Sequence, residues 1–193
     1  MSKVSISKTE VVYDERTTLK KVTYAIEKGG KRNEQTREVV QRPNAATCLL
    51  YNPEQQVVLF TRQVRIATHV NGNEGGLLLE VPAGLLEDGE DPADTMLREI
   101  LEETGYEVKG VEKLFAAYSS PGAFTELVHY FVAEYRPEQK KESGGGLEEE
   151  GEDIEIVELP FKEALQQVEQ GKIQDAKTIL LLQYAAMKGL LQA

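Results

Sequence analysis

Hydrophobic and polar residues alternate along the first forty positions, which is the pattern of half-buried strands. The segments 4–12 and 18–27 read VSISKTEVV and TLKKVTYAIE, and each mixes β-branched with charged residues. The pattern resumes at 34–41 after a turn at 28–31. Because three short strands are marginal by themselves, we expect a small antiparallel sheet that packs against something else, such as a second subunit.

After residue 42 the strands become more continuously apolar, as expected for strands buried on both faces. The runs ATCLLYN and QVVLFTRQVR flank Asn52-Pro53-Glu54 and predict a hairpin. Further strands are predicted at 113–119, at 126–136 and in IEIVELP. Residues 137–153 are rich in Gly and Glu and predict a flexible loop.

Helical spacing appears next in a segment with clear start and stop signals. Asp91 suits an N-cap, Pro92 suits the first helical position, and Gly105 suits a left-handed C-terminal residue. Two amphipathic helices, PFKEALQQVEQGK and DAKTILLLQYAAMKGLLQ, end the chain. The sequence therefore predicts an α/β protein with an N-terminal β-sheet domain at 1–42 and a main domain at 43–193.

The helix after Asp91 carries an acidic face opposite its apolar stripe. Glu99, Glu102 and Glu103 stand three and four residues apart, so their carboxylates crowd together. Each like-charged pair costs roughly 0.2–0.5 kcal/mol unless something compensates it. A hard divalent cation is suitable, because Mg²⁺ prefers carboxylate oxygens and substrate phosphates.

The surrounding letters carry a family resemblance. Residues 84–106, GLLEDGEDPADTMLREILEETGY, match G-x5-E-x7-R-E-U-x-E-E-x-G-U at every fixed letter, with Tyr106 as an aromatic last U. The stretch resembles the Nudix box. The resemblance implies a Nudix α/β/α sandwich with a mixed sheet, and hydrolysis of a nucleoside diphosphate linked to another group.

More than the box is similar to the nucleotide-sugar and ADP-ribose pyrophosphatases of that family. The segments VNGNEGG at 70–76, GGGLEEEGEDIE at 144–155 and DAKTILLL at 175–182 resemble the branch that acts on GDP-mannose. Pro121 stands sixteen residues after Gly105, a spacing that resembles the ADP-ribose branch and keeps ADP-ribose as an alternative substrate. A catalytically retired nucleotide-sugar sensor is an alternative of another class, although such proteins usually lose box carboxylates.

The resemblance also implies a metal site. Mg²⁺ is the expected cofactor, with Mn²⁺ as the alternative. Glu99 and Glu103 would ligate it directly, and Glu102 directly or through water. The backbone carbonyl of Ala83 and the late Glu152 would add further ligands.

Other residues are assigned catalytic and substrate roles by the same resemblance. Arg98 would hold a box carboxylate, and the general base is left open between Glu126 and Glu150. Contacts with the substrate are expected from Ala83, which is also an expected metal ligand. Further substrate contacts are expected from residues that are not metal ligands: Arg16, Arg37, Glu38, Arg65, Leu85, Glu126 and Lys177.

The amino-acid composition limits the kinds of partner that the protein is expected to bind. The net charge of −11 and the pI of about 4.8 argue against nonspecific nucleic-acid binding, which needs Lys and Arg to neutralise phosphates. The single cysteine, Cys48, excludes a disulfide within the chain, and no apolar run approaches a membrane span. With no apolar leader at its start, we expect a cytoplasmic homodimer that acts on a small nucleotide sugar.

Overall fold

The computed structural model describes residues 2–147, 149 and 151–192. The chain forms two compact units, one made of residues up to Asn44 with Ala117–Val128, and the other of Ala45–Ala116 with the residues from His129 on. The first unit also includes Ala117–Val128 from the middle of the chain, so it is larger than the N-terminal domain expected at 1–42.

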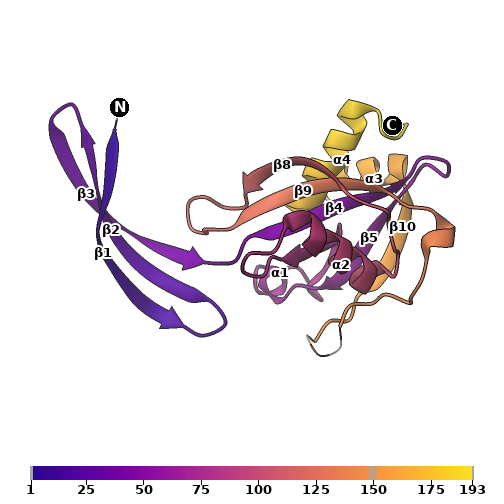
Figure 1. Ribbon diagram of the computed structural model, residues 1–193, viewed down its shortest axis with the longest axis horizontal. Coiled ribbons are helices and arrows are strands. Elements are labelled where there is room, and N and C mark those ends of the chain that lie inside the picture. The colour runs from indigo at the N-terminus through magenta and orange to yellow at the C-terminus, as the bar shows by residue number, and fades with distance from the viewer. Residues whose placement is uncertain (1, 148, 150, 193) are drawn as a thin grey trace. The chain divides into compact units, whose positions relative to one another are not determined.

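The first unit is built on a three-stranded antiparallel sheet of order β1-β2-β3 (Figure 1). Its strands are β1 (Lys3–Asp14), β2 (Thr18–Lys28) and β3 (Lys31–Gln41), close to the predicted segments. The backbone of Val40 in β3 is hydrogen-bonded to Ala123 at 2.8 Å and to Thr125 at 3.1 Å. This pairing explains why 117–128 belongs to the unit.

One face of the three-stranded sheet is apolar but exposed. Register places Val4 opposite Ile26 and Ile6 opposite Tyr24, so these four side chains share a face. Val4 is 61% and Ile6 67% exposed. Every described residue of β1 is exposed, and Ala25 is the single buried residue of β2. Among the described residues this sheet has almost no core of its own.

The second unit holds most of a seven-stranded sheet of order β10-β5-β4-β9-β8, with β6 paired to β5 and β7 to β4. Its strands are β4 (Ala45–Asn52), β5 (Val57–Val64), β6 (Leu77–Glu80), β7 (Ala83–Leu85), β8 (Glu112–Tyr118), β9 (Leu127–Glu134) and β10 (Glu155–Pro160). The hairpin β4–β5 forms where predicted, and β5 also pairs antiparallel with β6 and β10.

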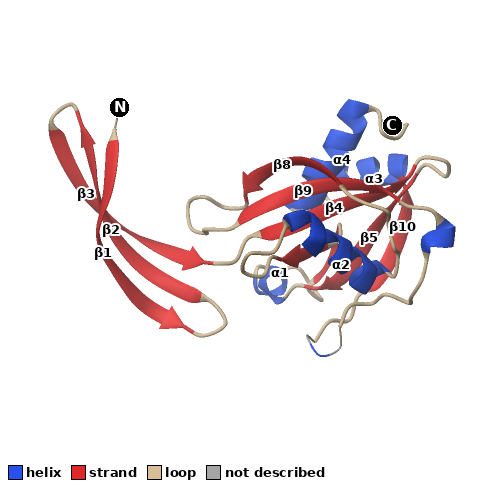
Figure 2. Ribbon diagram, in the orientation of Figure 1, coloured by secondary structure: helices blue, strands red, loops and turns tan. Residues whose placement is uncertain are grey.

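Helices cover both faces of this sheet (Figure 2). Helix α2 (Pro92–Thr104) packs on β4 and β7, while α4 (Ala176–Lys188) packs on β4 and α3 (Phe161–Glu169) on β5 and β10. All eight residues of β4 are buried, as expected of a strand covered on both sides. The α/β fold with a mixed sheet and an added N-terminal antiparallel sheet is confirmed.

Helix α2 begins and ends where the sequence predicts. The Asp91 side chain accepts a hydrogen bond from the Ala93 backbone at 2.8 Å, and Gly105 is left-handed with φ 72°. Beyond the cap, Tyr106 is 8% exposed and packs edge-on against Tyr135 at a centroid distance of 4.9 Å. The aromatic departure from the box thus fills the core beside α2.

Two segments differ from the sequence-based prediction. A short helix, α1 (Ile66–Val70), follows β5 in a stretch for which the sequence predicted no helix. The predicted flexible loop at 137–153 includes a 3₁₀ turn, η1 (Pro137–Gln139), and a stretch bonded to the end of α2. No helix among the described residues is long and apolar enough to cross a membrane.

Candidate active site

The acidic face of α2 is turned inward against the strand that precedes it. Glu103 is 2% exposed, and its Oε2 accepts a hydrogen bond from the Ala83 backbone N–H at 3.2 Å. The Glu99 carboxyl lies so close to Gly84 that a Cβ on residue 84 would overlap it. The box glycine is therefore required for close approach of backbone and carboxylate.

Arg98 is the centre of an ion-pair network on the same helix. Its Nη1 donates to Glu99 at 2.9 Å and to Glu102 at 3.0 Å, and its Nε lies 3.7 Å from Glu90. The structure therefore brings Arg98 to three box carboxylates. Glu90 also accepts a hydrogen bond from the Glu87 backbone at 3.2 Å, which ties the box loop to the helix.

Burial and like charge make this group of carboxylates hard to ionise. Burial, helped by the charges of Glu102 and Glu152, raises the pKa of Glu99 to about 6, although Arg98 opposes the change. Burial, helped by the charges of Glu99 and Glu152, raises the pKa of Glu103 well above its usual value. Such perturbed acids gathered in one place mark a candidate functional site.

The chain after η1 attaches to the C-terminal end of α2. Gly145 N–H donates to the Glu103 carbonyl at 2.9 Å and Gly146 N–H to the Glu102 carbonyl at 3.1 Å. The Glu152 carboxylate accepts from the Leu147 N–H at 3.2 Å and lies against Gly146. These backbone contacts bring Glu152 towards the box carboxylates, as its influence on their pKa also shows.

A second cluster combines two predicted cations with two acids. Arg65 Nε lies 2.5 Å and Lys177 Nζ 3.1 Å from the carboxylate of Glu80. Lys177 also contacts Asp175 at 2.7 Å. Burial raises the pKa of Glu103, and the charge of Arg65 opposes that rise, so the cluster is electrostatically linked to the box.

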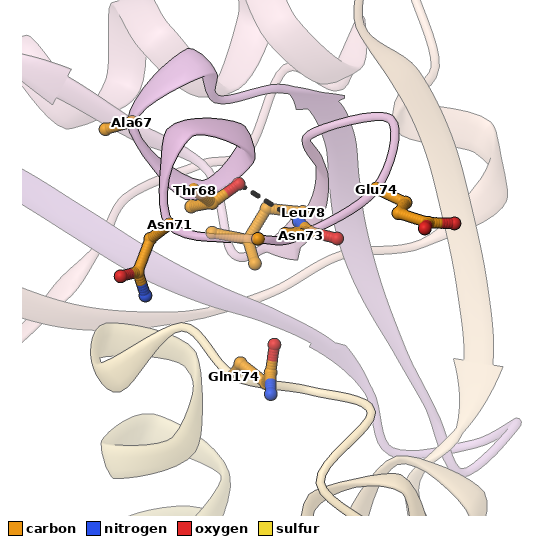
Figure 3. A pocket seen from close by; sticks show the side chains of 8 residues that line it. Ala67, Thr68, Asn71, Asn73, Glu74, Leu78 and Gln174 are labelled. Carbon is orange, nitrogen blue, oxygen red and sulfur yellow. Dashed lines mark hydrogen bonds between the residues drawn. The ribbon is translucent and has the colours of Figure 1, made fainter.

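A polar pocket of about 730 Å³ lies between the α1 turn and the segment before α4 (Figure 3). The side-chain amide of Asn73 donates to Thr68 and to the Leu77 carbonyl, each at 3.0 Å, which shapes one wall. Asn71 and Gln174 line the pocket, and their side chains make no hydrogen bond within the described part of the chain. The described lining holds no basic side chain, so it is unsuited to a phosphate.

The remaining predicted site residues are distributed differently. Leu85 lies in β7 and is 45% exposed. Arg37 and Glu38 lie in β3, and Arg16 in the turn before β2. Glu126 belongs to the same unit as these three, where Arg42 pairs with it at 3.5 Å. Glu150 lies outside the described residues.

The donors suit a hard divalent cation, although their present rotamers do not converge. Among residues 2–147, 149 and 151–192, no three acidic, His or Cys side chains are grouped closely enough to hold a metal ion as they stand. Arg98 forms ion pairs with Glu99 and Glu102 and so draws both carboxylates towards its guanidinium group. Three mutually repelling oxygen donors, Glu99, Glu103 and Glu152, nevertheless form the donor set that Mg²⁺ prefers.

Sequence reasoning missed Glu80 and Asp175. Glu80 follows an apolar run and resembles an ordinary strand end. Asp175 precedes an apolar run and resembles an ordinary helix cap. Asp175 is indeed the N-cap of α4 and bonds to the Thr178 backbone at 2.9 Å. Only the fold reveals that both acids also contact Lys177.

Fold, box geometry and the profile of the NUDIX domain, which matches residues 41–182, show that the chain belongs to the Nudix family. Within that family it is similar to proteins named GDP-mannose pyrophosphatase. It is 47% identical over 189 residues to those of Escherichia coli O157:H7 and Shigella flexneri serotype 5b. It is 46% identical to that of Salmonella arizonae. Each alignment covers 97% of this chain and 97% of the relative.

Proposed function

We propose that this protein hydrolyses the pyrophosphate bond of a nucleoside diphosphate sugar, with GDP-mannose as substrate and GMP and mannose 1-phosphate as products. The observation that carries the proposal is the buried carboxylate group around Glu99 and Glu103, held against Gly84. The 47% identity to GDP-mannose pyrophosphatases along nearly the whole chain supports the choice of substrate.

A divalent cation, Mg²⁺ or alternatively Mn²⁺, would be held by Glu99, Glu102, Glu103, Glu152 and the Ala83 carbonyl. When bound, it shields phosphate charge and lowers the pKa of water. Arg98 orients Glu99 and Glu102 through its two short hydrogen bonds.

The chain's own residues then position the substrate. Arg65 and Lys177 grip the diphosphate, because both are cations held in place by Glu80, and the charge of Arg65 acts on the box acid Glu103. Asn71, Gln174 and the other uncharged polar groups of the pocket suit the hydroxyl groups of a sugar. A glutamate takes the proton of the attacking water, with Glu126 and Glu150 as the candidates.

The protein acts as a homodimer in this proposal. The exposed apolar face of the three-stranded sheet, with Val4, Ile6, Tyr24 and Ile26, needs a cover. Arg37 lies opposite Val22 in the register and so shares that face. A partner that covers the face would receive Arg37 near its substrate. Glu38 follows Arg37 in β3 and points to the other face, and Arg16 lies in the turn before β2, so their proposed contacts are made from those positions. A reducing compartment, the cytoplasm, suits the single buried Cys48.

ADP-ribose is the second candidate substrate, on the strength of the Pro121 spacing. Steady-state rates with GDP-mannose, GDP-glucose and ADP-ribose, measured side by side in Mg²⁺, separate the candidates. The same assays run in ¹⁸O-water, with the products analysed by mass spectrometry, show which product carries the label and therefore which phosphorus is attacked. A higher kcat/KM for GDP-mannose is the expected result. Tight binding of all three without any product would instead favour a nucleotide-sugar sensor.

A further inference from the structure

Glu80 is a buried carboxylate outside the box, and both of its oxygens are engaged by cations. Its side chain is 5% exposed at the end of β6. Oε2 accepts from Arg65 Nε at 2.5 Å, and Oε1 accepts from Lys177 Nζ at 3.1 Å. These two cations come from segments far apart in the sequence, the end of β5 and the start of α4. Glu80 is therefore the point at which they are joined.

The arrangement leaves donors of both cations available. Arg65 uses its Nε towards Glu80, and its Nη1 and Nη2 groups make no hydrogen bond within the described part of the chain. The Lys177 ammonium has three N–H donors, of which two are directed to Glu80 and Asp175. A planar guanidinium edge and one ammonium N–H thus remain for an anion, and these are the groups that bind phosphate oxygens.

A second anion completes the cluster and is itself held rigidly. Asp175 Oδ2 accepts from the backbone and the hydroxyl of Thr178 at 2.9 and 2.7 Å, and that hydroxyl also accepts from the Val81 N–H at 2.9 Å. Val81 directly follows Glu80, so one short network fixes both acids. Burial lowers the pKa of Lys177, but the charges of Asp175 and Glu80 outweigh it and raise the pKa, so the ammonium stays charged.

We propose that Glu80 is a positioning residue that locks Arg65 and Lys177 in the orientation in which they receive the diphosphate. The inference rests on the proposed function, in which these two cations grip the substrate. Glu80 acts through them and does not touch the substrate, since its two oxygens are occupied and it is buried.

Positioning and simple charge balance predict opposite effects. If Glu80 merely tempered the positive charge, its neutralisation would strengthen the attraction for the diphosphate and lower KM. If it positions the cations, neutralisation frees them and raises KM. The variant Glu80→Gln tests this cleanly, because a glutamine amide offers one acceptor oxygen and one donor NH₂, whereas both neighbours are donors only. The amide can therefore satisfy one cation at most.

The experiment is a double-mutant cycle with Glu80→Gln and Arg65→Ala, read as kcat/KM for GDP-mannose in saturating Mg²⁺. Misplacement of a substrate-gripping group by about 1 Å costs on the order of 100-fold. We expect Glu80→Gln to lower kcat/KM by about 10- to 100-fold, mostly through KM, and to add much less in the Arg65→Ala background. Glu155→Gln, which breaks the Arg62–Glu155 pair at 3.0 Å on the same sheet, is the matched control and should leave kcat/KM unchanged.

The outcomes are distinguishable. An undiminished effect of Glu80→Gln in the Arg65→Ala background, or a lower KM, overturns the positioning role. If Arg65→Ala and Lys177→Ala each leave KM unchanged, the proposed grip on the diphosphate fails and takes the inference with it. If Glu80→Gln unfolds below the assay temperature, Glu80→Asp replaces it. Aspartate keeps the charge but is one methylene too short for both cations, so the same coupled loss is expected.

Discussion

At the scale of single residues, the site is governed by the conflict between burial and charge. Glu103 is nearly enclosed, yet the Ala83 N–H is the only hydrogen-bond donor that its carboxylate meets among the described residues. A buried carboxylate with so little compensation resists ionisation. The conflict is resolved if a cation enters, and the acids then serve as ligands instead of as a destabilising cluster.

The variant Glu103→Gln separates function from folding. It preserves shape and the Ala83 hydrogen bond but removes one metal-binding charge. We expect kcat to fall by several orders of magnitude, in keeping with loss of a metal ligand. The thermal midpoint of the metal-free variant should equal or exceed that of the parent, because a buried charge is removed. Near-normal kcat would refute the ligand assignment.

The same acids predict a pH dependence of the metal-free fold. A carboxyl whose pKa is raised in the folded state binds more protons when folded than when unfolded. Its contribution is therefore present at low pH and lost as pH rises. For Glu99 the loss runs from pH 4.5 to about pH 6 and amounts to about 2 kcal/mol. Glu103, whose pKa burial also raises well above its usual value, adds to this loss.

Chemical denaturation in a chelator, run from the usual glutamate pKa to neutral pH, measures this loss. Glu99→Gln should flatten the curve, and added Mg²⁺ should restore stability at the upper end. A stability that rises through this window in the parent, with no change in Glu99→Gln, would contradict the raised pKa values.

At the scale of elements, the C-terminal end of α2 and the loop that follows η1 act as one piece. The loop donates backbone hydrogen bonds to the Glu102 and Glu103 carbonyls, which a helix end otherwise leaves unsatisfied. Glu152 is thereby anchored to the same turn that presents the box carboxylates.

Two glycines in this loop allow that anchoring to be tested with a matched pair. Gly146 and Gly151 have similar positive φ values of 79° and 73°, so alanine strains both backbones alike, by roughly 1–2 kcal/mol. A Cβ at 146 would also collide with the side chains of Glu152 and Ile154, whereas a Cβ at 151 meets no described residue within 4 Å. We expect Gly146→Ala to weaken Mg²⁺-dependent turnover at least tenfold more than Gly151→Ala. Equal losses would show that steric displacement of Glu152 is unimportant.

At the scale of the whole molecule, the three-stranded sheet is an element with Ala25 as the single buried residue of its strands. Its exposed apolar face exceeds what isolated surface residues explain, and the covering surface must come from outside the sheet. A second copy of the chain is the occupant that we propose.

Adjacent strand positions provide a test, because successive side chains point to opposite faces. Ile6→Asp places a charge on the apolar face, and Ser5→Asp places the same charge on the other. Light scattering should give a dimer for the parent and for Ser5→Asp, and a monomer with raised KM for Ile6→Asp. A monomeric parent, or an Ile6→Asp variant that stays dimeric, would disprove the proposed interface.

Local patterns were sufficient for a large part of this protein. The cap at Asp91, the stop at Gly105 and the spacing of Glu99, Glu102 and Glu103 depend on neighbours within a few residues, so the sequence alone predicts α2 and its acidic face. Alternation and apolar runs likewise predict the strands, because burial on one or two faces leaves a direct trace in residue order.

Contacts between distant segments left no such trace. The junction of Arg65, Glu80 and Lys177, and the attachment of Gly145 and Gly146 to the end of α2, arise only when the sheet brings those segments together. Their residue types are ordinary at their own positions in the chain. The sequence thus determined which residues carry charge and where the helix that bears the acids begins and ends, while the tertiary structure decided which charges are buried and which partners they meet.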